Sequence, residues 1–338
     1  MLRIIVRLLL LAVVTTTALI GQETLYTLKV DVPLVSVDIT VTDAFGKTVN
    51  DLSAQDFQVL ENGIPQQIRY FSPVSSPYNI LLLFDRSGST QHKWPFMQKA
   101  VAGFVANLRP QDRIAIDCFD FEFETLAGWS DRRDKALEAL TRLTTSKTIG
   151  GTALYRALDT ALRRQFKDIA GRRALVVLTD GRDTSLYKGI LAQNRMMNTD
   201  EDRPFQRTLR LAGDQRIPIY FVAMNTDLNF EPNVGGSDEY RNLQVIFPKS
   251  SIAEAYLNGV RSRMQQLAER SGGRMLYPRR IEDIVPLYER IGRELGTSYS
   301  LGYTPAEERS DGSLRRIEIR TADPALRLTQ SRTAYYAK

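Results

Sequence analysis

The pattern of apolar and polar positions changes twice along the chain. In residues 34–42 every second residue is apolar, which predicts a strand with one buried face. A short apolar stretch leads into Asn62 and Gly63, a pair that favours a tight hairpin turn, and residues 68–71 are expected to form the return strand. The segment from about residue 23 to 74 is therefore predicted to be a small all-β unit.

From about residue 77 the pattern becomes that of alternating strands and helices. Residues 79–84 are a continuous apolar run that ends at Asp85, which is typical of a parallel strand buried on both faces. This alternation predicts a doubly wound α/β domain with a mostly parallel sheet. The further strands are expected at residues 114–119, 174–179, 217–223 and 275–277, and the helices at 94–108, 135–143, 152–166, 207–214, 253–271 and 281–295.

The C-terminal part returns to strand periodicity. Apolar and polar residues alternate at 299–303 and at 317–320, a turn is expected at 310–313, and a last strand opens at 326. Because a lone hairpin is marginally stable in water, these strands need a partner sheet. We expect them to pack with the N-terminal strands into a flanking β-sandwich-like unit, into which the α/β domain is inserted.

The first residues predict export. Arg3 and Arg7 precede an apolar run followed by smaller residues, which is the order of a secretory signal peptide. The apolar stretch 8–20 is shorter than the ~20 residues that cross a bilayer, so membrane contact is expected only through an uncleaved signal. A periplasmic, cell-surface or secreted protein is predicted. The expected parts are a signal peptide at 1–21, an N-terminal β domain at 22–76, the α/β domain at 77–296 and C-terminal strands at 297–338.

Composition removes several classes of chemistry. Of 338 residues, 43% are hydrophobic and 25% charged, which is typical of a globular protein. The single His92 and single Cys118 are too few for a Cys/His zinc site, an internal disulfide or a Cys–His catalytic pair, so any metal must be held by oxygen. The formal net charge of +6 arises from basic residues scattered among acidic ones, which predicts no nucleic-acid surface.

Three loops at the carboxyl ends of predicted strands carry oxygen-bearing side chains, and ligands of open parallel sheets bind at that edge. Asp85, Ser87 and Ser89 lie on the first loop, Thr152 opens a predicted helix, and Asp180 follows a predicted strand. Singly, each motif also fits a helix cap or a turn. Together, carboxylates and hydroxyls suit a hard divalent cation, Mg²⁺ or Mn²⁺. With only two carboxylates, the ion would attract a further anion, such as a carboxylate of a protein partner.

The Asp-x-Ser-x-Ser motif, followed by a separate Thr and a separate Asp, resembles the metal-ion-dependent adhesion site of the von Willebrand factor A domain. The resemblance covers about residues 77–295. It implies one bound ion, hydroxyls that ligate it directly, acidic residues that ligate it directly or through water, and a partner Glu or Asp that completes the shell. Residues 37–41, 56–63 and 299–303 also resemble a family of exported bacterial proteins, the von Willebrand A-related acidobacterial domain proteins. The residues that meet the metal-site pattern in order are Asp85, Ser87, Ser89, Thr152 and Asp180.

A hydrolase is the alternative. Phosphotransfer enzymes of the haloacid dehalogenase type also place an Asp after an apolar strand, but Ser87 stands where their second carboxylate would handle protons. His92 as a base for a serine is disfavoured because no Gly-x-Ser-x-Gly surrounds either serine. We therefore expect a non-enzymatic binding module for metal-dependent protein recognition or adhesion, with a metal-dependent hydrolase acting on an envelope component as the alternative. Long segments at 182–203 and 225–251 are expected to shape the ligand site, with disorder as the other interpretation.

Overall fold

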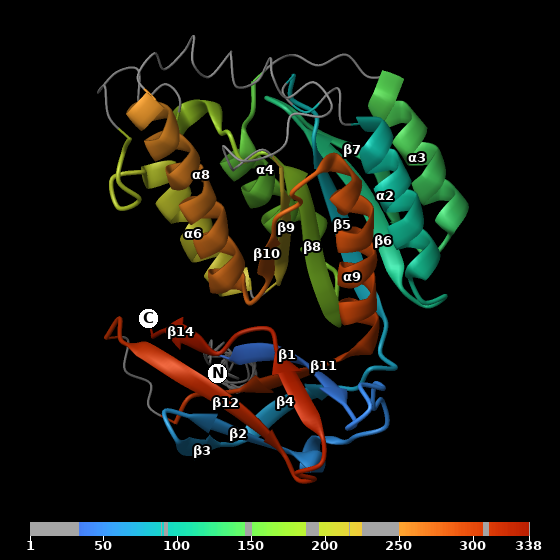
Figure 1. Cartoon of the computed structure of the whole chain (residues 1–338), viewed down its shortest axis with the longest axis vertical. Coiled ribbons are helices and arrows are strands. Elements are labelled where there is room, and N and C mark those ends of the chain that lie inside the picture. The colour runs from blue at the N-terminus through green and yellow to red at the C-terminus, as the bar shows by residue number, and fades with distance from the viewer. Residues whose placement is uncertain are drawn as a thin grey trace, which may run out of the picture. The chain divides into compact units, whose positions relative to one another are not determined.

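Three sheets organise the part of the chain that the structure describes (Figure 1). The structure is a computed structural model and describes residues 34–88, 90, 94–145, 151–186, 196–215, 217–224, 250–306 and 311–337. The predicted signal segment at 1–21 and much of the two long loop segments lie outside these residues.

The central sheet has six strands in the order β10-β9-β8-β5-β6-β7. All neighbours in it pair in parallel except β6 and β7, which are antiparallel. The predicted doubly wound, mostly parallel α/β fold is thus confirmed. Its strands are β5 (Tyr78–Asp85), β6 (Arg113–Phe119), β7 (Phe123–Ser130), β8 (Arg172–Thr179), β9 (Ile219–Ala223) and β10 (Arg274–Leu276). Only β7 was not predicted, because Leu126 is its one buried residue and an edge strand of this kind has little apolar periodicity.

Helices cover both faces of the central sheet, α2, α3 and α9 on one side and α4, α6 and α8 on the other (Figure 1). This explains the unbroken apolar run of β5, because Leu82 and Phe84 enter one core while Leu81 and Leu83 enter the other. No helix among the described residues is long and apolar enough to span a bilayer. The helices are α2 (Trp94–Asn107), α3 (Arg133–Thr145), α4 (Leu154–Thr160) with a π-helical continuation η3 (Ala161–Gln165), α6 (Arg203–Gln215), α8 (Ser250–Ser271) and α9 (Ile284–Thr297); short 3₁₀ turns are η1 (Ala54–Asp56) and η4 (Ile281–Asp283).

Strands from both ends of the chain form the flanking unit, which has two four-stranded sheets ordered β13-β1-β11-β4 and β14-β12-β2-β3. β1 pairs with β11 so that Val37 lies opposite Leu301, and both side chains enter an apolar core shared by the two sheets. The strands are β1 (Val35–Thr42), β2 (Phe57–Glu61), β3 (Ile64–Gln66), β4 (Ile68–Ser72), β11 (Ser298–Tyr303), β12 (Leu314–Thr321), β13 (Arg327–Gln330) and β14 (Ala334–Tyr336).

Two predicted strand pairings are wrong. Asn62 and Gly63 form the expected turn, with positive φ of 50° and 82°. The return strand, however, is β3, which begins directly after Gly63, because a two-residue turn leaves no room for a longer connection. Residues 68–71, predicted as the return strand, belong to β4, which pairs with β11 in the opposite sheet. β11 and β12 likewise lie in different sheets, so the predicted turn at 310–313 does not close a hairpin between them.

Arg172, the first residue of β8, ties the central sheet to the flanking unit. Its buried guanidinium donates to the carbonyls of Val74 and Ser76 at 3.3 and 3.2 Å, to the Ser298 carbonyl and to Ser300 Oγ at 3.3 Å. These contacts reach both the segment that enters the central sheet at β5 and the strand that leaves it at β11. One side chain therefore fixes both connections of the inserted domain.

An ion pair is buried between the two flanking sheets. Arg315 Nη1 lies 2.9 Å from Glu61 Oε1, and both side chains are only 4% exposed. The hydroxyls of Tyr303 and Tyr335 each donate to Glu61 Oε2 at 2.7 Å. Removing one member of such a pair leaves the other charge buried and uncompensated.

Arg315→Met is therefore expected to lower the free energy of unfolding by about 3 kcal/mol. The matched control is Arg320→Met on the same strand, whose ion pair with Glu318 is more than half exposed and contributes little. Urea unfolding of the two variants measures the difference. Equal losses of unfolding free energy in the two variants would show that the buried ion pair of Arg315 and Glu61 stabilises the fold no more than the exposed pair does.

A second buried carboxylate lies inside the central sheet. Asp117 of β6 is fully buried beside Thr125 of β7 and Gln165 of η3. Burial raises the pKa of Asp117 to about 7, although Thr125 and Gln165 counteract part of that rise. Because the pKa is higher in the folded than in the unfolded chain, the stability associated with this group is fully present below about pH 4 and is lost as the pH rises through 7.

Asp117→Asn removes this titration, so the variant should gain stability relative to the wild type as the pH rises from 4 to 7. We expect the difference in unfolding free energy to grow by about 1 kcal/mol per pH unit in that window. Urea unfolding at a series of pH values measures it, with the exposed Asp131→Asn as control. A difference that does not change with pH would contradict the raised pKa.

Candidate metal site

The site lies where the order of strands reverses. From β5 the chain passes to β6 on one side and later to β8 on the other, and ligands of open parallel sheets bind at such a switch point. Asp85 is the last residue of β5, and Asp180 directly follows β8. The pairing of Phe84 with Leu178 places Asp85 beside Thr179. Sheet register alone thus brings the two predicted carboxylates to one point.

The Asp85 carboxylate is completely buried and held by hydrogen bonds on both oxygens. Thr179 Oγ1 donates to Oδ2 at 2.5 Å, and the backbone N–H of Ser87 donates to Oδ1 at 3.0 Å. Thr90 Oγ1 donates to the carbonyls of Asp85 and Ser87 at 2.6 and 2.9 Å. The turn that carries the Asp-x-Ser motif is therefore rigidly oriented.

The electrostatics of the site are dominated by two like charges. Burial, followed by the neighbouring Asp180 carboxylate, raises the pKa of Asp85 to about 7, while the hydrogen bonds from Ser87 and Thr179 counteract part of this rise. Asp180 is also fully buried, and Arg182 Nε lies 3.8 Å from its Oδ2. Two buried carboxylates beside one guanidinium retain negative charge, which a cation would compensate.

Thr152 is joined to these residues through the third loop. Its N–H donates to Thr184 Oγ1 at 2.9 Å, and its carbonyl accepts from the N–H of Thr184 at 2.9 Å. Thr184 lies four residues after Asp180, so the Thr152 and Asp180 loops are held together. The structure thus joins Asp85 to Ser87 by a hydrogen bond, to Asp180 through the electrostatic interaction of their carboxylates, and to Thr152 only indirectly. Ser89 and His92 lie outside the described residues.

Two residues that brace the site were not predicted from the sequence. Arg86, inside the Asp-x-Ser motif, lies 3.5 Å from Asp120 and 2.5 Å from Glu124, so it anchors the loop between β6 and β7. Asp120 also accepts from the N–H of Glu122 at 2.8 Å. A signal for Asp120 was present, because it directly follows the predicted strand 114–119, just as Asp85 and Asp180 follow theirs. No comparable signal marks Arg86.

An aromatic side chain borders the loop that carries Thr152. Phe121 is 38% exposed, and its ring packs so closely on Gly151 that an added Cβ there would lie 2.2 Å from the ring. Gly151 also has φ of +72°, which disfavours other residues. The N–H of Ala153 donates to the Asp120 carbonyl at 2.9 Å, which secures the contact. The rim of the site is therefore partly apolar.

The donors suit a hard cation with an incomplete protein shell. Within the described residues no three His, Cys, Asp or Glu side chains gather around one point, so a cation here would rely on two carboxylates and neighbouring hydroxyls. Oxygen ligands of this kind fit Mg²⁺ or Mn²⁺, which readily keep water or accept an external ligand in the remaining positions. The Asp85 and Asp180 pair supplies the charge for which such an ion would be bound.

No curated protein matches the chain significantly. Among solved structures, a von Willebrand factor type A protein from Catenulispora acidiphila is 12% identical, with a TM-score of 0.47, covering 90% of this chain and 73% of its own. The von Willebrand factor domain of the pilus tip protein Mfa5 from Porphyromonas gingivalis is 11% identical, with a TM-score of 0.42. The match covers 64% of this chain and 94% of that domain. Proximal thread matrix protein 1 from the mussel byssus, described with a zinc-occupied metal site, is 14% identical, with a TM-score of 0.45. The match covers 68% of this chain and 48% of the mussel protein.

At the level of families, the sequence profile of the von Willebrand factor type A domain matches residues 79–269, more than half of the chain. The matched segment runs from β5 through most of α8 and contains all three loops of the site. The chain therefore belongs to the von Willebrand factor type A domain family.

Proposed function

We propose that this protein is an exported binding module that holds one divalent cation and uses it to recognise a carboxylate on a partner protein. The proposal rests on one observation. The buried Asp85 and Asp180 carboxylates interact electrostatically at the carboxyl ends of β5 and β8, where the strand order reverses, and the backbone N–H of Ser87 donates to Asp85. Mg²⁺ or Mn²⁺ is the proposed ion. Its proposed ligands are those of a complete metal-ion-dependent adhesion site: Asp85, Ser87, Ser89, Thr152 and Asp180.

The charge balance favours a ligand that is itself anionic. Two carboxylates balance the charge of one divalent ion, so the Arg182 guanidinium, with Nε 3.8 Å from Asp180 Oδ2, leaves the ion-bound site with a positive charge. The oxygens of Asp85 are already engaged by Thr179 and Ser87. An ion bound by few protein ligands keeps exchangeable positions, and an incoming Glu or Asp would complete its shell. Phe121 on the neighbouring loop offers apolar contact to the rest of that partner. Recognition is favoured over hydrolysis because Ser87 stands where hydrolases of the haloacid dehalogenase type carry their second carboxylate.

Export and domain division complete the proposal. The basic and apolar start of the chain supports a signal peptide at 1–21, which would place the protein in the periplasm, on the cell surface or in the medium. We further propose the division into 22–76, 77–296 and 297–338. Membership of the acidobacterial group of von Willebrand A-related proteins is supported by the flanking strands at both ends of the A domain.

Calorimetric titration of metal-depleted protein with Mg²⁺ and Mn²⁺ is expected to show one saturable site that Asp85→Ala abolishes. Asp131→Ala, an exposed aspartate after β7, should bind metal like the wild type. At a metal concentration 100 times Kd, the wild type should gain about 2.7 kcal/mol of stability. The isosteric Asp85→Asn variant should show no such gain while remaining as stable as the metal-free wild type, because it removes a buried like charge. Metal binding by Asp85→Ala equal to the wild type would overturn the site.

The carboxylate step needs its own measurement. Immobilised wild-type protein with Mg²⁺ should retain proteins from an envelope extract that metal-depleted wild type and Asp85→Ala do not retain. Amidation of the carboxyl groups in the extract should abolish this retention. Retention that survives amidation would contradict recognition through a partner carboxylate and leave the metal site to be judged by the titration alone.

A further inference from the structure

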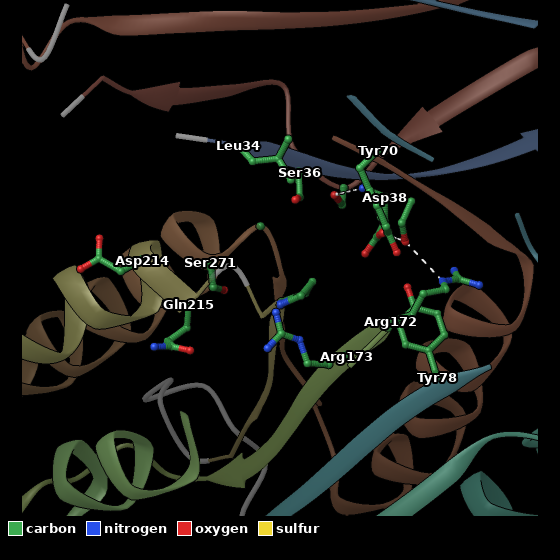
Figure 2. A pocket seen from close by; sticks show the side chains of 15 residues that line it. Leu34, Ser36, Asp38, Tyr70, Tyr78, Arg172, Arg173, Asp214, Gln215 and Ser271 are labelled. Atoms are coloured by element: carbon green, nitrogen blue, oxygen red, sulfur yellow. Dashed lines mark hydrogen bonds between the residues drawn. The ribbon is translucent and has the colours of Figure 1, made fainter. Parts of the chain in front are cut away.

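A second polar site lies at the opposite edge of the central sheet. A pocket of about 410 Å³ opens where β5 and β8 begin, lined by Tyr78, Arg172 and Arg173 from these strands and by Ser36 and Asp38 from β1 (Figure 2). β5 separates this edge from Asp85 by roughly 23 Å at the rise of an extended strand. The pocket is therefore distinct from the candidate metal site, and it has the size of small-ligand cavities.

Two consecutive arginines of β8 have opposite roles here. Successive side chains of a strand point to opposite sides. Arg172 is buried against the Tyr78 ring at 3.9 Å, and its guanidinium is saturated by the hydrogen bonds described above. Arg173 is half-buried and, among the described residues, makes no hydrogen bond or ion pair. Figure 2 shows its side chain turned away from Arg172, toward the part of the pocket bordered by Gln215 and Ser271.

Further hydrogen-bond donors surround Arg173. The side chains of Ser36, Tyr70 and Gln215 line the pocket and make no hydrogen bonds to the described part of the chain. Tyr70 is also close enough to Arg173 to interact with it electrostatically. Burial lowers the pKa of Arg173, which means that the pocket does not compensate its charge well. A guanidinium with neutral donors around it is complementary to an anion.

Other charges around the pocket limit that anion to a single negative charge. Asp38 and Asp214 also line it, and Asp38 accepts from Ser300 Oγ at 2.5 Å. The carboxyl ends of α6 and α8 reach the pocket at Gln215 and Ser271, and helix carboxyl ends carry partial negative charge. A phosphate dianion would be repelled by these groups. One carboxylate matches the planar fork of one guanidinium, and the acidic side can accept from hydroxyl or amino groups.

We propose that this pocket binds a small hydroxy or amino acid whose carboxylate pairs with Arg173. The carboxylates of Asp38 and Asp214 then face the hydroxyl or amino groups of the ligand. A sugar acid and a short peptide both carry this chemistry. The site is independent of the proposed metal and partner, because it uses none of the residues of the carboxyl edge.

Calorimetric titrations of the full chain, depleted of metal on a chelating resin, test the proposal. The probes are D-galacturonate with neutral D-galactose as its control, alanyl-alanine with alanyl-alaninamide as its control, and inorganic phosphate. At least one acid should bind saturably, and its neutral counterpart should not. Binding of galacturonate but not of the dipeptide would identify the ligand as a sugar acid. Binding of the dipeptide but not of galacturonate would identify it as a peptide.

Two variants and a control assign the binding to Arg173. Arg173→Gln should lower the affinity for the acid at least tenfold. Arg173→Lys keeps the positive charge but loses the paired N–H donors of the guanidinium, so its affinity should lie between those of the wild type and Arg173→Gln. Arg164→Gln, at an exposed position of η3, should bind normally, and so should Asp85→Ala, which separates this pocket from the metal site. Three results would overturn the proposal: no acid binds, Arg173→Gln binds like the wild type, or phosphate binds more tightly than either acid.

Discussion

The parallel pairing of β5 with β8 is the constraint on which both sites depend. Its register places Tyr78 opposite Arg172 at one end and Phe84 opposite Leu178 at the other. From Ile80 to Phe84 every side chain of β5 is buried in an apolar core, so the polar side chains of β5 lie at its two ends. At the carboxyl edge the pairing brings Asp85 and Asp180 together. At the amino edge, where the parallel strands β5 and β8 begin, it places Arg172 and Arg173 side by side in sequence. A shift of β8 by one residue would exchange which arginine is buried and separate the carboxylates from their partners.

The protein handles buried carboxylates in three different ways. Glu61 is matched by Arg315 and two tyrosine hydroxyls, which compensates the charge within the fold. Among the described residues, Thr125 and Gln165 are the polar groups that counteract the burial of Asp117, and its pKa, raised to about 7, means that the group is protonated in acid and loses its proton around neutral pH. Asp85 also has a raised pKa, but its cause includes a second carboxylate, Asp180, at the edge of the sheet. Of these three arrangements, only the last pairs two acids on the loops that follow β5 and β8, which is why the metal proposal rests there.

Much of the fold was predictable because it follows from periodicity. The apolar run before Asp85 indicates a strand buried on both faces, and the alternation of apolar and polar residues at 34–42 indicates a strand with one buried face. The wrong return strand had a local cause, since the Asn62 and Gly63 turn determines where β3 starts but says nothing about β4, whose partner β11 lies over 200 residues away. The placement of Asp85, Ser87 and Asp180 near one another was predictable because the carboxyl ends of β5 and β8 converge, whereas their role as metal ligands stays a prediction. The Arg173 pocket was not, because its walls come from residues between 34 and 331 with no shared motif.

Insertion of the A domain into the flanking unit explains why the two edges of the sheet differ. The chain enters at Tyr78, the first residue of β5, and leaves α9 directly into β11 at Ser298, so both connections lie at the amino edge. Arg172 bonds to carbonyls on both connections, which makes that edge an attachment surface with its polar groups satisfied. Arg173, one residue further along the same strand, points away from those carbonyls and keeps its donors available. Within the described residues, neither connection to the flanking unit lies at the carboxyl ends of the strands, so the proposed recognition there would not disturb the attachment.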